Sequence, residues 1–185
     1  MNTKTKKLST VSMVLCGMFA ALVAIGAFIQ IPVPYMDYFT LQFFFVLLAG
    51  LILGADKGAI SVGCYVLLGL VGVPIFAAGG GIGYIFRPSF GYLVGFIVSA
   101  YVTGKVCEKL KASYKNYLLA CLAGFVVTYA IGIVYKFIIL NFYAHTPATL
   151  GVIFLSCFPL DMPGDFVLCL LAAGVGLRMR KSGFY

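Results

Sequence analysis

Six apolar stretches, separated by short polar or glycine- and proline-containing segments, dominate the chain. They cover about residues 11–30, 41–53, 59–73, 88–103, 117–140 and 158–177. Because lipid offers no hydrogen bonds to the backbone, apolar segments of this kind cross membranes as helices. We therefore predict an all-α membrane protein with six transmembrane helices. The second and third stretches are shorter than the about 20 residues of an upright span. Either neighbouring helices cover these two short segments, or the two segments end below the membrane surface and leave room for a ligand.

The composition supports an integral membrane protein. Hydrophobic residues make up 63% of the 185 residues and charged residues 10%, whereas soluble domains have about 45–50% and about 25%. This length allows a single six-helix membrane domain over residues 1–185. The net charge of +8 does not indicate a nucleic-acid partner, because the charges flank apolar stretches and form no basic patch.

The basic residues lie mostly on one side of the predicted bundle. An even number of spans places both termini on the same face, and that face collects eleven of the thirteen Lys and Arg residues: Lys4, Lys6, Lys7, Lys57, Lys105, Lys109, Lys111, Lys115, Arg178, Arg180 and Lys181. Cytoplasmic loops carry such an excess of positive charge. We therefore expect both termini in the cytoplasm and the segment between the third and fourth helices outside the cell.

That outer segment is rich in glycine and aromatic residues. It contains the run Gly79–Gly81, then Tyr84, Phe86 and Arg87. Glycines allow close approach of the backbone to a ligand, and aromatic rings provide apolar walls. One interpretation is a lid over a small anionic ligand. The other is a tight loop in which Arg87 anchors a helix end at the interface.

Three more polar residues are predicted to share this outer end: Lys136, Asn141 and Asp165. A lysine in an apolar helix either extends to the interface or serves a site. A carboxylate in the first turn of the last helix is stabilised by the helix dipole. Their placement with the glycine segment predicts an outward-facing ligand pocket.

Familiar catalytic and nucleotide-binding patterns are absent from the sequence. It has no GxxxxGK[ST] loop, and its glycine run is not set in a βαβ unit. The six cysteines include no CxxC pair, and the single histidine has no neighbouring ligand types. We therefore expect no metal, no cofactor and no enzymatic activity. The function class that remains is the recognition and transport of a small solute, with energy supplied by a partner protein.

Several motifs resemble one known family in order along the chain. They are PVP and TLQ, VLLAGLILG, GLVGVPIFAAGGG, RPSFGYLVGF, and PGD at the start of the last helix. Together they resemble the BioY family, the biotin-specific substrate-binding (S) components of energy-coupling factor (ECF) transporters. This resemblance implies capture of biotin from outside a bacterial cell by a multi-pass protein of the cell membrane. It also implies a complex with a membrane coupling subunit and two cytoplasmic ATPases, which would hydrolyse the ATP.

The resemblance assigns roles to particular residues. Small residues four apart on the first helix resemble the family's coupling surface, here Ala20 and Ala24. Asp165 corresponds to the acid of the PGD motif. Many members continue as PGDxxK, but Leu168 occupies that lysine position. Either Arg87 or Lys136 replaces the missing cation, or the ligand differs.

Biotin would then be bound by residues of the predicted pocket. Asp165 would accept a ureido N–H, supported by Gln42 or Asn141. The rings of Tyr84, Phe86 and Tyr92 would pack on the bicycle, and Arg87 would pair with the carboxylate. Alternatives are another vitamin or small anion in the same fold, or a self-sufficient oligomeric channel or carrier.

Overall fold

The computed structural model describes residues 9–31, 38–144, 146, 148–157 and 161–182, and these residues are mainly helical. Lys4, Lys6, Lys7 and the PVP motif (residues 32–34), which the predictions use, fall outside this part of the chain. The α-helices are α1 (Thr10–Phe28), α2 (Gln42–Leu53), α3 (Ala55–Val71), α4 (Phe90–Lys109), α5 (Tyr114–Ile138), α6 (Leu150–Cys157) and α7 (Asp161–Lys181).

Each of the six apolar stretches contains a helix at its predicted place. By length and composition, four helical segments are suited to cross a membrane: Thr10–Phe28, Phe90–Lys109, Tyr114–Tyr143 and Asp161–Lys181. The helices α2 and α3 have 12 and 17 residues. The prediction of a helical membrane protein is therefore confirmed, while the count of six spans goes beyond what length and composition establish.

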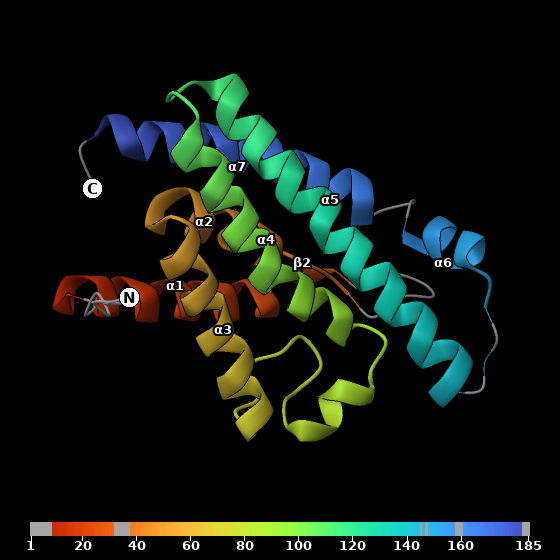
Figure 1. Ribbon diagram of the computed structural model, residues 1–185. Helices are drawn as coiled ribbons and strands as arrows, with labels where there is room; N and C mark the ends of the chain where they lie inside the picture. Colours follow the sequence, from red (N-terminus) through yellow and green to blue (C-terminus); the bar gives the residue numbers. More distant parts are fainter. Residues whose placement is uncertain (1–8, 32–37, 145, 147, 158–160, 183–185) are drawn as a thin grey trace, which may run out of the picture.

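The helices form a bundle around α2, which contacts α1, α3, α4 and α7 (Figure 1). The most extensive packing joins α4 to the antiparallel α5. Glycines allow this close approach, because a Cβ atom on Gly91 would overlap the side chain of Tyr135, and one on Gly95 would lie 3.0 Å from the Thr128 carbonyl oxygen. Small residues at helix crossings are the usual means of close packing in membranes.

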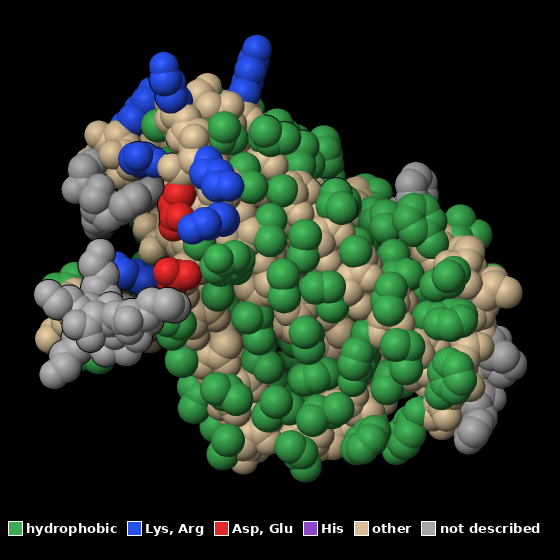
Figure 2. All heavy atoms as spheres, viewed as in Figure 1, with side chains coloured by type: hydrophobic (Ala, Val, Ile, Leu, Met, Phe, Trp, Pro, Cys, Tyr) green, Lys and Arg blue, Asp and Glu red, His purple; other side chains and the backbone are tan. Residues whose placement is uncertain are grey.

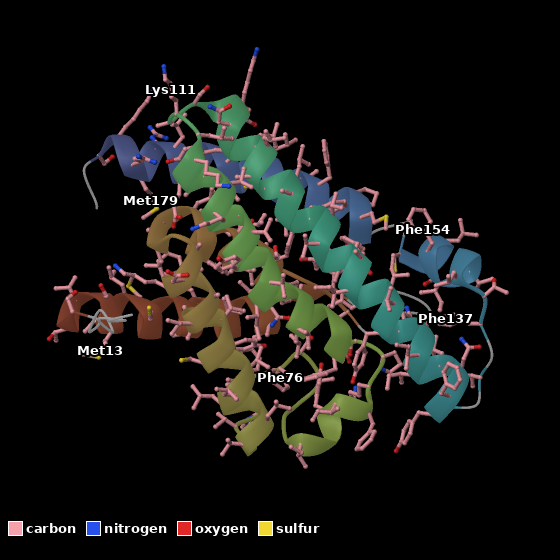
Figure 3. All side chains as sticks on the ribbon, in the orientation of Figure 1. Met13, Phe76, Lys111, Phe137, Phe154 and Met179 are labelled. Carbon is pink, nitrogen blue, oxygen red and sulfur yellow. The ribbon has the colours of Figure 1, made fainter. Side chains whose placement is uncertain are left out.

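One end of the bundle carries the basic residues. Lys and Arg side chains gather over the α4–α5 turn and the last turns of α7, while the rest of this face is largely hydrophobic (Figure 2). At the same end, Glu108 links the last turn of α4 to the start of α3. Its Oε1 accepts a 2.9 Å hydrogen bond from the backbone N–H of Ala55. Lys111, in the α4–α5 turn, points away from the bundle (Figure 3).

The glycine-rich segment between α3 and α4 forms a compact loop at the opposite end. Gly72 ends α3 with φ of 118°, a value that favours glycine. The Phe76 ring points into the fold (Figure 3) and packs directly on Gly69, where a Cβ would overlap it. Gly81, with φ of 98°, donates a 2.7 Å hydrogen bond back to the Gly69 carbonyl oxygen. The loop is thereby folded onto the end of α3.

Three local elements were not predicted from the sequence. Strands β1 (Gln30–Ile31) and β2 (Phe39–Thr40) form an antiparallel pair, a 3₁₀ helix η1 spans Ile82–Phe86, and α5 continues as a π-helix η2 over Ile139–Tyr143. The short helix α6 also lies between the fifth and sixth apolar stretches, where no helix was predicted. All four are too short to produce a periodicity that a sequence pattern reveals.

Candidate ligand-binding cavity

A cavity of about 430 Å³ opens at the end of the bundle that holds the glycine-rich loop. Ligand sites for small molecules are about 300–1,000 Å³. Its wall combines residues from β2, α2, the loop, α4, α5 and α7: Tyr38, Phe39, Thr40, Gln42, Phe43, Ala77, Tyr84, Pro88, Ser89, Tyr92, Leu93, Phe96, Tyr129, Lys136, Leu140, Asp161 and Asp165. The site therefore depends on the packing of nearly the whole bundle.

A buried carboxyl group forms one polar part of the wall. Asp165 is 9% exposed, and its Oδ2 accepts a 2.8 Å hydrogen bond from the Tyr129 hydroxyl. Because α5 and α7 pack side by side, the contact fixes the acid against the neighbouring helix. A carboxyl group accepts several hydrogen bonds, so Asp165 can also accept one from a ligand.

A second polar network includes Gln42 on α2. Its Oε1 accepts a 3.1 Å hydrogen bond from the Thr40 hydroxyl, and its Nε2 donates one of 2.5 Å to the Tyr65 hydroxyl. Tyr65 in turn donates to the Ile75 carbonyl oxygen at 3.1 Å. This chain connects α2, α3 and the glycine-rich loop. It holds the loop at the cavity, and Gln42 lies on the wall as predicted for a ligand contact.

Aromatic side chains provide most of the remaining wall. The Tyr92 and Tyr129 rings meet edge to face at 5.8 Å between centroids, and Phe43 stacks on Phe96 at 5.9 Å. Tyr84 reaches the wall from η1 and is 6% exposed. Such a surface suits a flat apolar ring system.

Lys136 lies on the wall on the same face of α5 as Tyr129, seven residues away. Its Nζ donates a 3.4 Å hydrogen bond to the Ser156 hydroxyl of α6, and Asp161 at the start of α7 lines the same cavity. Among the wall residues given above, Lys136 is the one with a permanent positive charge. The cavity thus has a lysine toward the C-terminal end of α5 and a buried acid, Asp165, on α7.

Three of the predicted ligand contacts do not line the cavity. The Arg87 guanidinium lies 5.4 Å from the centroid of the Tyr84 ring, so it supports that ring through a cation–π contact. Phe86 is 52% exposed and stacks on Tyr143 at 4.8 Å. The Asn141 amide bonds the backbone of Phe137 and Ala148 instead. The sequence placed all three at the correct end, but the direction of each side chain is set by η1 and η2.

The predicted coupling residues on α1 also differ in exposure. Ala20 is 7% exposed and belongs to the core, while Ala24 is half-buried. Gly17 and Ala21 are instead the exposed pair of small residues four apart. A Cβ on Gly17 would meet no atom within 4 Å. The helix turns Ala20 toward α2 and α3, so the structure does not support Ala20 as a free docking surface.

Sequence analysis missed several wall residues. Tyr129 is the most important, and its spacing of seven from Lys136 was the available signal, because residues two turns apart share a helix face. Asp161, four residues before Asp165, also lines the cavity but was not predicted as a ligand contact. Both spacings can be read from the sequence, but only the packing of α5 against α7 shows that these residues line one cavity.

The sequence and the fold were compared with those of known proteins. The sequence profile described as "BioY family" matches residues 1–183. The chain belongs to the BioY family. It is 40% identical over 177 residues to "Probable biotin transporter BioY" of Lysinibacillus sphaericus, covering 95% of this chain and 90% of that protein. It is 39% identical to "Biotin transporter BioY" of Thermotoga maritima, covering 89% and 93%.

A solved structure is similar in fold as well. The S-component for biotin from an ECF-type ABC transporter superposes on this BioY chain with a TM-score of 0.81 and 25% identity, covering 98% of this chain and 95% of that one. These relatives are transporters rather than enzymes. In this BioY chain Leu168, three residues after Asp165, is 6% exposed and packs in the hydrophobic core. It does not line the cavity.

Proposed function

We propose that this protein binds biotin in the cavity and acts as the S component of an ECF transporter. The observation that carries the proposal is the chemistry of the wall, with Asp165 held by Tyr129, a lysine on the same face of α5, and aromatic rings around them. Biotin has ureido N–H donors, an apolar bicycle and a carboxylate. The names and coverage of the BioY relatives support the same ligand.

The wall suggests how biotin lies in it. Asp165 accepts a ureido N–H, and the rings of Tyr84 and Tyr92 pack against the bicycle. Lys136 pairs with the carboxylate, in place of the lysine that Leu168 replaces. Charge-assisted hydrogen bonds of this kind are the strong ones. Arg87 acts indirectly by supporting Tyr84.

The proposal includes an orientation in the membrane. Six helices, with α2 and α3 as the short ones, cross the bilayer with both termini in the cytoplasm. The basic end with Lys105, Lys109 and Arg178 faces inward, and the cavity and the glycine-rich loop face outward. Biotin then enters from outside.

Uptake requires partners in this proposal. A coupling subunit in the membrane and two cytoplasmic ATPases would supply the energy, because the chain itself has no P-loop. The small exposed residues Gly17 and Ala21 of α1 suit close approach of another helix. Ala24 lies beside them, one turn further on.

The role of Lys136 is tested with purified protein and isothermal titration calorimetry. Lys136→Met should weaken biotin binding more than it weakens binding of the neutral methyl ester, by at least about tenfold. Arg87→Ala is the matched control, because it also removes one positive charge but from outside the cavity. If Arg87→Ala shows the charge-dependent loss and Lys136→Met does not, the carboxylate lies elsewhere.

A further inference from the structure

Asp161 lies on the cavity wall but is not used by the contacts described so far. It occupies the first turn of α7, one turn before Asp165 on the same face. Its Oδ1 is buried and has no hydrogen-bond partner among the described residues. A buried acceptor without a partner costs about 1–3 kcal/mol. Such an atom on a cavity wall is explained when the ligand supplies the missing donor.

Asp161 and Lys136 face the cavity together. Lys136 is on α5 and Asp161 on α7, and both line the cavity, but these two described side chains form no ion pair with each other. The wall thus offers a positive donor and a negative acceptor at the same end, on α5 and α7. The Ser89 hydroxyl, also on the wall, is a further buried polar atom without a partner among the described residues.

A free carboxylate on the ligand interacts favourably with only one of these two residues. It is attracted by Lys136 and repelled by Asp161, since like charges disfavour each other at short range. An amide group interacts favourably with both, because its C=O accepts from the Lys136 ammonium and its N–H donates to Asp161 Oδ1. An amide also carries no charge that Asp161 would repel.

We propose that Asp161 is a specificity-determining residue that lets the cavity accept biotin whose carboxyl group is in amide linkage. The ligand class includes biotinamide and biotin joined to the ε-amine of lysine. In both, the ureido ring keeps its place at Asp165, and the amide lies between Lys136 and Asp161. Anything attached beyond the amide nitrogen extends through the open mouth of the cavity. This inference rests on the proposed function, since it assumes that biotin itself binds.

The first test needs no variant. Calorimetry on the wild-type protein compares biotin, biotinamide and Nε-biotinyl-lysine. We expect the two amides to bind within about threefold of biotin, because the Asp161 contact replaces the lost ion pair. Amide affinities more than about a hundredfold weaker would overturn the inference while leaving biotin binding intact. Absence of binding by all three compounds would instead reject the proposed function.

The second test changes Asp161 itself. Asp161→Asn keeps an acceptor oxygen but removes the negative charge, so biotin affinity should rise about tenfold and biotinamide affinity should change little. The control is Asp56→Asn, which removes an exposed acid at the opposite end of the bundle. Equal changes for biotin and biotinamide in Asp161→Asn would show a merely structural role and overturn the inference.

Discussion

The Tyr129 hydroxyl donates a 2.8 Å hydrogen bond to Oδ2 of Asp165, and both residues line the cavity. The contact links the middle of α5 to the first turns of α7. It also fixes the direction of the buried carboxyl group. The position of the acid in the cavity therefore depends on two helices that are distant in sequence.

Tyr129→Phe should weaken biotin binding about fivefold, because the Asp165 carboxyl group loses a neutral hydrogen bond that is worth about 1 kcal/mol. The ring contacts with Phe125 and Tyr92 remain, so the fold is preserved. Calorimetric Kd values provide the measurement. Tyr101→Phe on α4, which removes a hydroxyl from a 40% exposed ring, should have no effect. Equal losses in both variants would contradict a role for the hydrogen bond.

Asp165→Asn should reduce biotin affinity by about 10- to 150-fold, which corresponds to the roughly 1.5–3 kcal/mol of a hydrogen bond to a charged group. Titration of the purified variant measures this directly. A thermal melt without ligand verifies that the variant is folded. Unchanged affinity in a folded variant would remove Asp165 from the binding site.

Part of this structure follows from sequence patterning alone. Apolar periods located the six main helices, and the positions of Lys105 and Arg178 identified one end of the bundle. The same patterns placed Tyr84, Lys136 and Asp165 near one another, and the resemblance to the BioY family added Gln42 and Tyr92 as ligand contacts; all five line the cavity.

The remaining details depend on local geometry that patterns do not contain. Phe86 and Arg87 follow Tyr84 by two and three residues, yet of these three only Tyr84 is directed to the wall by the 3₁₀ turn η1. Asn141 lies in the π-helix η2, where its amide binds neighbouring backbone groups. Ala20 and Ala21 are consecutive, and only the rotation of α1 decides that Ala20 is buried. One residue of offset on a helix changes the direction by about 100°.

Close packing of α4 on α5 should be sensitive to small additions. Gly91→Ala places a methyl group against Tyr135, so we expect a loss of about 1–3 kcal/mol in stability from overpacking. Thermal unfolding in detergent measures the shift. Gly17→Ala is the control, because a Cβ there meets no atom within 4 Å. A lower melting temperature for Gly17→Ala than for Gly91→Ala would contradict this packing.

The exposed face of α1 should matter for transport and not for binding. Ala21→Leu adds bulk between Gly17 and Ile25, so it should reduce biotin uptake by cells that contain the partner subunits. Biotin affinity of the purified variant should stay within about twofold. Met13→Leu, on an exposed position of the same helix, serves as the control. Normal uptake by Ala21→Leu would place the coupling surface elsewhere.

The most direct measurement is equilibrium binding of biotin to the purified wild-type protein in detergent, by calorimetry. The account predicts saturable one-to-one binding, which weakens in Asp165→Asn and Lys136→Met. A folded wild-type protein that binds no biotin would contradict the central claim. The cavity would then belong to a different small solute.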